Sequence, residues 1–162
     1  MAQGDVGRGT YPMKKLRVYI DTSVIGGCFD REFAADSNAL FQNAEDGAIK
    51  LVVSDVLAAE IENAPEEIRQ FYASLPDDLL EVVAAGPEAD SLHEAYLRAG
   101  VVGPASGDDA MHVAIATVLG CDIVVSWNFK HIVHYDKIRA YNAVNLREGY
   151  SMIAIHSPTE VV

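Results

Sequence analysis

Cysteines are scarce in this sequence. Its 162 residues include only two, Cys28 and Cys121, which form no CxxC pair or other spacing typical of metal ligands. No cluster of Cys and His residues has the spacing of a structural zinc site, so that class of site is excluded. We expect both thiols to be buried as small apolar side chains, as in a protein of the reducing cytoplasm.

Long hydrophobic runs are also absent. Half of the residues are hydrophobic and 22% are charged, which is ordinary for a folded domain. The longest apolar stretches, such as 51–53 and 123–125, are far shorter than the roughly 18 residues needed to span a bilayer. The N-terminal segment lacks the apolar core of a secretory signal. The sequence therefore predicts no membrane segment and a cytoplasmic location.

Basic residues are outnumbered by acidic ones. Twelve Lys and Arg stand against 24 Asp and Glu, a formal net charge of −12 that is unfavourable for binding nucleic acid through the whole surface. The acidic excess is concentrated between Asp55 and Asp122. The basic and histidine side chains that follow this segment form a cluster, the expected phosphate-binding surface: Lys130, His131, His134, Lys137, Arg139 and Arg147. The alternative for this cluster is a solvated helix face.

Short apolar segments alternate with helical patterns along the chain. Strands are predicted at 16–20, 49–53, 79–83, 123–126 and 150–155. Helices are predicted from 21–23 onward and at 33–46, 54–64, 65–74, 88–99, 108–119 and 135–146. Because the strands are apolar on both faces, we expect a parallel sheet covered by helices on both sides, an α/β sandwich.

The length of the chain is that of one domain. We expect the folded domain at residues 13–157. Residues 1–12 are polar and Gly-rich without periodicity, which predicts a flexible N-terminal segment or a remnant outside the fold. Residues 158–162 are expected to form a short C-terminal tail.

Oxygen-bearing side chains lie close to the ends of several predicted strands. Asp21 comes directly after the first strand, and Glu60 lies in the helix after the second. Asp108 and Asp109 open the helix before the fourth strand, and Asn128 follows that strand. Ligands of parallel α/β sheets bind beyond the carboxyl ends of the strands. If the first and fourth strands are neighbours, we expect these side chains to converge at one edge of the sheet.

A pocket with several carboxylates needs a positive partner. The carboxylates repel one another and raise each other's pKa values unless a cation neutralises them. Mg²⁺ or Mn²⁺ prefers oxygen ligands, retains some water molecules, and activates a water for attack on a phosphate. The expected cofactor is therefore Mg²⁺ or Mn²⁺.

Four stretches of the sequence stand out as motifs, in chain order VYIDTSVIGG, SDVLAAEI, DDAMHVAIA and VVSWNFKHI. They resemble the successive motifs of PIN-domain proteins, including VapC-type toxin ribonucleases. Their order and structural context are fairly specific, and together they span nearly the whole predicted domain. The resemblance implies a single-domain, PIN-like three-layer sandwich with a central parallel β-sheet flanked by helices.

The resemblance also assigns roles to residues. It implies that Asp21, Glu60 and Asp109 are the catalytic metal ligands. The family's fourth position, often acidic, is Asn128 here. An amide can ligate a metal or orient a water but cannot share the charge of the metal, so one metal is expected rather than two. Residues expected to support the site are Thr22, Ser23, Asp108, His112 and Ser126, the hydroxyls among them by binding the carboxylates. The expected substrate contacts are Lys130, His131, His134 and Lys137.

The implied function is a metal-dependent endoribonuclease that hydrolyses RNA phosphodiesters. The implied partners are an RNA substrate, a small antitoxin protein if the chain is a toxin, and a second copy in a homodimer. One alternative is a non-catalytic PIN scaffold that binds RNA or protein, which Asn128 and the acidic surface favour. Another is a phosphatase of the haloacid dehalogenase type with Asp21 as nucleophile. That pattern wants a second Asp where Ser23 stands, and only Lys130 could serve as its later lysine.

Each candidate also has an ordinary structural interpretation. Helix-start acids complement the helix dipole, a helical Glu is commonly a surface residue, and a single His or Trp in an apolar segment commonly packs in the core. These alternatives apply to Asp21 as a helix cap, Glu60 as a surface residue, Asp108 and Asp109 as first-turn acids, and His112 and Trp127 as packing residues, with base stacking the other option for Trp127.

Overall fold

The computed structural model describes residues 14–162, which form a five-stranded parallel sheet with the strand order β3-β2-β1-β4-β5. The strands are β1 (Leu16–Ile20), β2 (Ile49–Ser54), β3 (Leu80–Val83), β4 (Ile123–Val125) and β5 (Ala154–His156). The central strand β1 pairs in parallel with β2 on one side and with β4 on the other. The strand order therefore changes direction between β1 and β4, which in such sheets marks the usual place for a ligand.

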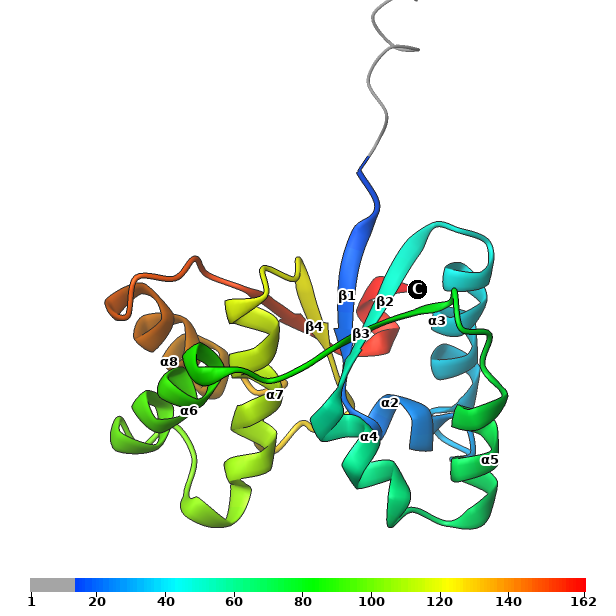
Figure 1. Cartoon of the computed structure of the whole chain (residues 1–162), viewed down its shortest axis with the longest axis horizontal. Coiled ribbons are helices and arrows are strands. Elements are labelled where there is room, and N and C mark those ends of the chain that lie inside the picture. The colour runs from blue at the N-terminus through cyan, green and yellow to red at the C-terminus, as the bar shows by residue number, and fades with distance from the viewer. Residues whose placement is uncertain (1–13) are drawn as a thin grey trace, which may run out of the picture.

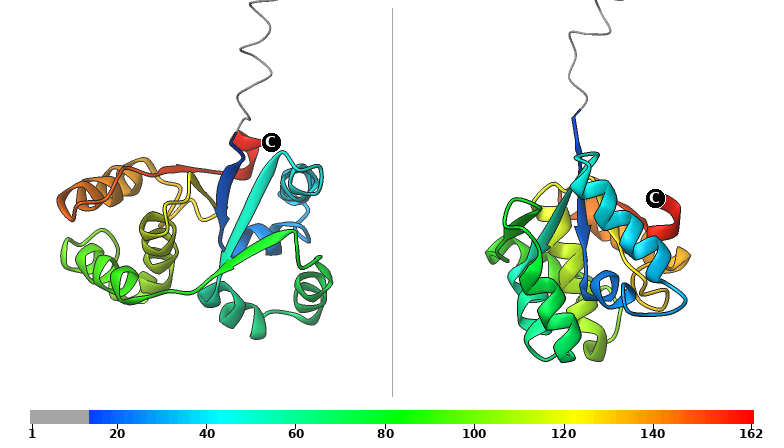
Figure 2. Two further views of the ribbon diagram at one scale, coloured as in Figure 1. Left: turned by 45° about the horizontal axis from the view of Figure 1, so that its top comes forward. Right: turned by 90° about the vertical axis from the view of Figure 1, so that its right-hand side faces the viewer.

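Helices cover both faces of this sheet (Figures 1 and 2). One face carries α2 (Thr22–Gly27), α3 (Ala34–Glu45), α4 (Asp55–Glu62), α5 (Glu66–Ser74) and α9 (Pro158–Val161). The other carries α6 (Pro87–Arg98), α7 (Gly107–Val118) and α8 (Tyr135–Arg147), with a short 3₁₀ turn at Pro104–Ser106 before α7. The fold is a three-layer α/β sandwich, as the sequence predicts.

The side chains of β1 alternate between two apolar cores. Val18 and Ile20 pack with α2, α3 and α4 on one face, whereas Tyr19 packs with α6, α7 and α8 on the other. All three side chains are buried. Because successive side chains of a strand point to opposite faces, burial on both sides requires apolar residues throughout the strand.

Helix ends follow the chemistry of their sequences. The Ser54 hydroxyl accepts a hydrogen bond from the Leu57 amide and caps α4. The expected ends of α3 and α7 at Gly47 and Gly120 are confirmed, because both glycines adopt positive φ angles, of 80° and 68°. This left-handed backbone conformation ends a helix and is least costly for glycine.

The structure differs from the sequence prediction near the C-terminus. The strand predicted at 150–155 is observed only at Ala154–His156, which pairs with β4; Ser151 and Met152 are exposed and precede the paired register. The expected tail is wrong over Pro158–Val161, which forms α9. A capping box between Ser157 and Glu160 starts this helix, and α9 packs against α3.

Two further sequence predictions concern a membrane segment and the N-terminal residues. Within residues 14–162, no helix is both long and apolar enough to cross a membrane. The prediction of a flexible segment at residues 1–12 lies outside the described residues.

A close approach at Gly27 provides a test of the packing beside the site. A Cβ atom at Gly27 would lie 2.5 Å from the Ser37 Oγ and 2.6 Å from the Trp127 Nε1. We predict that Gly27→Ala lowers the free energy of unfolding by about 1–3 kcal/mol, because the buried indole has no room to move. Urea unfolding followed by circular dichroism measures this change.

The adjacent glycine supplies the control. At Gly26 an added Cβ would meet only the Ile68 Cδ1, at 3.9 Å. Gly26→Ala is therefore expected to leave the free energy of unfolding unchanged or to raise it by up to about 1 kcal/mol, from the better helix propensity of alanine. Equal losses in the two variants would show that the contact between α2 and Trp127 is not as tight as described.

Candidate active site

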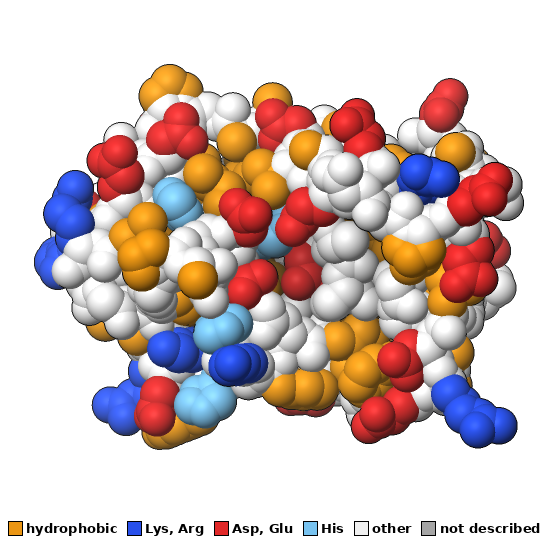
Figure 3. Space-filling view, turned by 90° about the horizontal axis from the view of Figure 1, so that it is seen from below, with side chains coloured by type: hydrophobic (Ala, Val, Ile, Leu, Met, Phe, Trp, Pro, Cys, Tyr) orange, Lys and Arg blue, Asp and Glu red, His pale blue; other side chains and the backbone are white. Residues whose placement is uncertain are grey.

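The carboxyl ends of β1 and β4 bring together residues that are far apart in the sequence. In the parallel pairing Ile20 lies opposite Val125, so Asp21 and Ser126 directly follow neighbouring positions. The first and fourth strands are thus neighbours, the condition under which the sequence predicts convergence. Figure 3 views the molecule from below Figure 1 and shows acidic side chains gathered near the middle of this face.

Asp21 is buried at this edge, with 4% of its surface exposed. Its Oδ1 accepts a hydrogen bond from the Ser23 hydroxyl at 2.6 Å, and its Oδ2 accepts one from the Ser126 hydroxyl at 2.8 Å. Burial raises the pKa of Asp21 and the charge of Glu60 raises it further, against the opposing effects of His112 and the hydroxyls. Asp21 occupies the N-cap position of α2 but makes no capping bond with its side chain, so its interpretation as a helix cap is wrong.

Glu60 of α4 is held by two other side chains. The Thr22 hydroxyl donates to the Glu60 Oε1 at 2.8 Å, and the His112 Nε2 lies 2.6 Å from the same oxygen. Burial acts to raise the pKa of Glu60, but the hydrogen bonds from His112 and Thr22 and the charge of His112 outweigh it, so the pKa is lowered. Glu60 is therefore a fixed, charged member of the site rather than a free surface residue.

His112 of α7 is the common neighbour of the three predicted carboxylates. Its imidazole is 1% exposed. Burial acts to lower the pKa of His112, but the hydrogen bond with Glu60 and the charges of Asp21, Glu60 and Asp109 outweigh it, so the pKa is raised. The three acids thus act on a single imidazole and favour its protonated form, which carries a positive charge into this acidic pocket.

A chain of hydrogen bonds extends from His112 into the core. The His112 Nδ1 lies 2.6 Å from the Tyr19 hydroxyl, which in turn lies 2.7 Å from the Ser54 hydroxyl. A protonated imidazole donates from both nitrogens, and this arrangement gives each nitrogen an acceptor. Sequence reasoning missed Tyr19 and Ser54. The signal for Tyr19 is a tyrosine within a buried strand, whose hydroxyl needs a polar partner.

The acidic pair at the start of α7 divides into two environments. Asp108 is exposed, whereas Asp109 is partly buried and its charge raises the pKa values of both His112 and Tyr141. Both acids lie in the first turn of the helix, where a negative charge is favourable. The structure therefore places Asp109, and not Asp108, toward the carboxylate pocket.

Asn128 has a role that the sequence did not predict. Its Oδ1 accepts hydrogen bonds from the backbone amides of Lys130 and His131, at 3.2 and 2.9 Å. Asparagine side chains commonly stabilise turns in this way. The amide oxygen is thus engaged in holding the loop after β4, and this geometry lends no support to Asn128 as a metal ligand.

The basic and histidine cluster begins in the loop after β4, and Figure 3 shows Lys, Arg and His side chains gathered on the same face as the acidic ones. Lys130 and His134 are exposed. The Lys137 ammonium donates to the Val101 carbonyl at 2.6 Å, and the His131 Nε2 lies 3.1 Å from the Ser106 hydroxyl. Lys130 and His134 are therefore more available to a phosphate than Lys137 and His131.

The donor set fits a divalent cation in part. Within residues 14–162, no three His, Cys, Asp or Glu side chains are grouped closely enough to form a ready-made metal site. Asp21 nevertheless carries a burial penalty that a cation would relieve, and Glu60 is near enough for its charge to act on Asp21. Mg²⁺ is commonly held by one or two carboxylates together with water and substrate phosphates. Asp21 and Glu60 are the carboxylates at this end of the sheet that could serve in this way.

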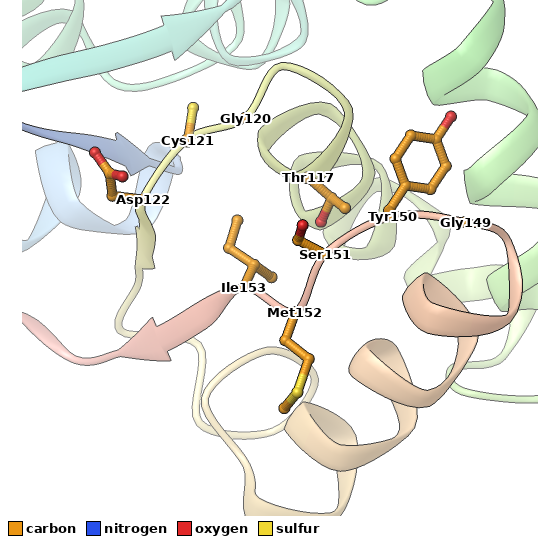
Figure 4. Close-up of a pocket in the computed structure, with 9 residues that line it drawn as sticks. All are labelled: Thr117, Gly120, Cys121, Asp122, Gly149, Tyr150, Ser151, Met152 and Ile153. Atoms are coloured by element: carbon orange, nitrogen blue, oxygen red, sulfur yellow. The ribbon is translucent and has the colours of Figure 1, made fainter.

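A different cavity, of about 440 Å³, opens at the opposite edge of the sheet (Figure 4). Its lining includes Thr117, Asp122 and Ser151, near the amino ends of β4 and β5. The Asp122 carboxylate accepts a hydrogen bond from the Arg17 amide at 2.7 Å, and the Thr117 hydroxyl donates to the Val113 carbonyl. The polar groups of Asp122 and Thr117 already make structural hydrogen bonds. The residues around Asp21, at the carboxyl ends of β1 and β4, are therefore the better candidate for a functional site.

Comparison with known proteins supports the fold. No family model matches the sequence, and a search of curated proteins finds no match. Among solved structures, the chain is similar to FitAcB from Neisseria gonorrhoeae, with a TM-score of 0.57, 12% identity, and coverage of 88% of this chain and 98% of that chain. It is also similar to VapBC2 from Rickettsia felis bound to a DNA fragment from their promoter, with a TM-score of 0.54, 11% identity and the same coverages. The chain has a PIN-like fold of the VapC type.

A third similarity shows why the fold does not decide the function. Tyrosyl-tRNA synthetase from Archaeoglobus fulgidus, complexed with L-tyrosine, matches with a TM-score of 0.52 and 15% identity. The match covers 90% of this chain and 55% of that chain. Since α/β sandwiches of this kind serve several functions, the function has to be argued from the side chains at the Asp21 edge.

The raised pKa of His112 predicts a pH dependence of stability. Above pH 6.5, its ordinary value, the unfolded chain loses the imidazole proton while the folded protein retains it. The resulting stabilisation is fully present below pH 6.5 and is lost as the pH rises through the raised pKa. We predict that the free energy of unfolding of the metal-free protein falls with pH above 6.5. Urea unfolding at a series of pH values measures the slope.

Two substitutions separate His112 from the other histidines. His112→Gln is expected to flatten the slope, because the titrating group among Asp21, Glu60, Asp109 and Tyr19 is gone. His156→Gln, which changes a partly exposed histidine paired with Glu160, should retain it. An unchanged slope in His112→Gln would contradict the assignment of the proton to this imidazole.

Proposed function

We propose that the chain is a divalent-metal-dependent endoribonuclease that hydrolyses RNA phosphodiesters at the Asp21 edge of the sheet. The observation that carries the proposal is the buried Asp21 carboxylate, which lies at the strand-order switch within the electrostatic reach of Glu60 and shares His112 with Glu60 and Asp109. The similarity of the fold to FitAcB and VapBC2 and the four PIN-like motifs are consistent with it.

The residues at the carboxyl ends of β1 and β4 would have different roles in this reaction. A bound Mg²⁺ or Mn²⁺ would supply an activated water and neutralise phosphate oxygens. Asp21 and Glu60 would hold the ion, with Asp109 contributing negative charge. Ser23 and Ser126 fix both oxygens of Asp21, and Thr22 and His112 fix Glu60. Fixed carboxylates need no rearrangement when substrate binds, which is the main source of catalytic power in electrostatic sites.

Substrate would approach from the side of the basic cluster. Lys130 and His134 are exposed, and the Lys130 amide donates to Asn128, whose own amide donates to Ser126 at the end of β4; both basic side chains are suited to phosphate oxygens. The chain carries a formal net charge of −12, with the acidic excess concentrated between Asp55 and Asp122, which disfavours RNA binding through the surface as a whole. Binding would therefore be confined to this face.

The geometry disfavours a phosphatase that uses Asp21 as its nucleophile. Both oxygens of Asp21 accept hydroxyl hydrogen bonds, which reduces their nucleophilicity. Position 23 is a serine that binds Asp21, whereas the haloacid dehalogenase pattern places a second acid there. The carboxylate is thus arranged to be held still rather than to attack.

A non-catalytic scaffold that binds RNA or protein is the second candidate. It is favoured by the hydrogen bond between His112 and Glu60, which satisfies the carboxylate without a metal. In that case the acidic pocket would be permanently neutralised by the imidazole. Cleavage of RNA separates the two candidates, because a scaffold would bind without cutting.

The family resemblance further suggests a toxin with an antitoxin partner, and a homodimer. An acidic body would attract a basic antitoxin segment. Growth arrest on expression in bacteria, absent with Asp21→Asn, would support the toxin role, and sedimentation would determine the oligomeric state.

We predict that the purified protein cleaves single-stranded RNA with Mn²⁺ or Mg²⁺ and that chelation stops it. Asp21→Asn should abolish cleavage, because it removes a charged ligand while keeping the shape of the side chain. Ser126→Ala should reduce the rate by roughly 10–100-fold, since it frees one oxygen of Asp21. Gel analysis of labelled RNA measures both rates.

Asp46→Asn is the matched control, because Asp46 is exposed at the end of α3 and precedes β2, away from the carboxyl edge. It should cleave like the wild type. Circular dichroism checks that all variants fold. If the folded wild type cuts no RNA with either metal, the nuclease proposal fails and the scaffold takes its place.

A further inference from the structure

A second cavity lies directly beside the Asp21 carboxylate and is not used by the reaction proposed above. Its volume is about 380 Å³. It is lined by side chains and backbone from α2, the loop after α2 and the loop after β4: Ser23, Gly26, Gly27, Asp30, Phe33, Trp127 and Asn128. The cavity and the carboxylate share a wall, because Ser23 lines the cavity and its hydroxyl donates to Asp21 at 2.6 Å.

Aromatic rings form one side of this cavity. Phe33 is stacked on Trp127, with ring centroids 4.1 Å apart and an angle of 20° between the planes. The exposed ring of Phe129 continues this surface and meets Trp127 edge-on at 6.2 Å. Planar rings at the edge of an RNA-cleaving site offer a stacking surface for an unpaired base.

The indole is held in place by several contacts. Its Nε1 donates to the Ser37 hydroxyl at 2.8 Å, and the Trp127 backbone amide donates to the Ser23 hydroxyl at 2.9 Å. The absence of a side chain at Gly27 allows the ring to lie against α2. The aromatic side of the cavity is therefore fixed relative to Asp21, as a subsite for part of a substrate requires.

Polar groups at the cavity can read the edge of a base. The Oδ1 of Asp30 accepts a hydrogen bond from the Glu32 amide at 2.8 Å, which orients the exposed carboxylate. A carboxylate accepts hydrogen bonds from an amino group and repels a phosphate. The Oδ1 of Asn128 is engaged by the backbone, which leaves its Nδ2 as a donor. An acceptor and a donor beside an aromatic surface match an amino-bearing base.

We propose that this cavity is a nucleobase subsite, in which a base with an exocyclic amino group stacks on the partly exposed ring of Phe33, itself stacked on the buried Trp127, and donates to Asp30. Uracil, which lacks the amino group, is disfavoured. The subsite rests on the proposed function for its biological meaning, since it would place the nucleotide next to the scissile phosphate. Its binding can nevertheless be measured without any cleavage.

Trp127 is the only tryptophan in the sequence, so intrinsic fluorescence reports on this cavity directly. The experiment titrates the metal-free wild type with short oligo(A), oligo(C) and oligo(U) RNA, under which conditions no metal-dependent cutting occurs. We expect oligo(A) and oligo(C) to quench the emission and to bind at least about 5-fold more tightly than oligo(U), from the hydrogen bond to Asp30. A Mg²⁺ titration with gel analysis then tests cleavage separately.

Matched variants show which side chains cause the preference for amino-bearing bases over uracil. Asp30→Asn keeps the bond to the Glu32 amide but removes the charge, and should reduce the preference over oligo(U) to about 2-fold or less. Glu32→Gln removes the same charge from an exposed neighbour and should leave the preference unchanged. Phe33→Leu should weaken binding of oligo(A) by about tenfold through lost stacking, whereas Phe29→Leu, outside the cavity lining, should not.

Several results would overturn the subsite. These are the absence of quenching by every oligonucleotide, equal affinities for oligo(A) and oligo(U), and equal effects of Asp30→Asn and Glu32→Gln. Quenching by an arginine-rich peptide but by no RNA would assign the cavity to a protein partner instead. If RNA binds with the expected preference but is not cut with Mg²⁺, the nuclease proposal fails while the subsite stands.

Discussion

The arrangement of side chains at the carboxyl ends of β1 and β4 depends on Asp21, a carboxylate that is buried where β1 ends. A charged group with 4% exposure is costly unless hydrogen bonds and opposite charge compensate for the loss of water. The hydroxyls of Ser23 and Ser126 and the imidazole of His112 provide part of that compensation for Asp21, whose pKa burial still raises. They come from α2, the end of β4 and α7, so the position of this one carboxylate links both faces of the sheet.

His112 interacts with the acids in two ways, through a hydrogen bond and through their charges. It makes a 2.6 Å hydrogen bond with Glu60, and it feels the charges of Asp21 and Asp109. These charges favour the protonated, positive form of the imidazole. A divalent cation bound to Asp21 and Glu60 would compete with the proton on His112 for the same negative charge, because both neutralise one pocket. Metal affinity and imidazole protonation are therefore coupled at this edge.

Much of the fold follows from the sequence, because strand and helix patterns are local. The parallel sheet, the helix ends at Gly47 and Gly120 and the cap of α4 at Ser54 were all predictable. The helix at Pro158–Val161 was not, since it is short and is stabilised by packing on α3. The local sequence pattern does not predict a tertiary contact of this kind.

The acidic residues of the candidate site could be chosen from the sequence, but several of the hydrogen bonds around them could not. Asp21 and Glu60 could be placed because each follows a strand, and the hydroxyls near them bind as expected. The bond from Tyr19 to His112 joins residues 93 positions apart and depends on how α7 packs on β1. The turn made by Asn128 depends on a loop conformation that residue type alone does not specify.

The most direct test of this account is calorimetric titration of the purified protein with Mn²⁺. The account predicts one binding site in the wild type and no binding in Asp21→Asn, with both proteins folded. It also predicts tighter binding at higher pH, as the proton leaves His112. No heat of binding in the wild type, or equal binding in Asp21→Asn, would contradict the claim that this buried carboxylate forms a metal site.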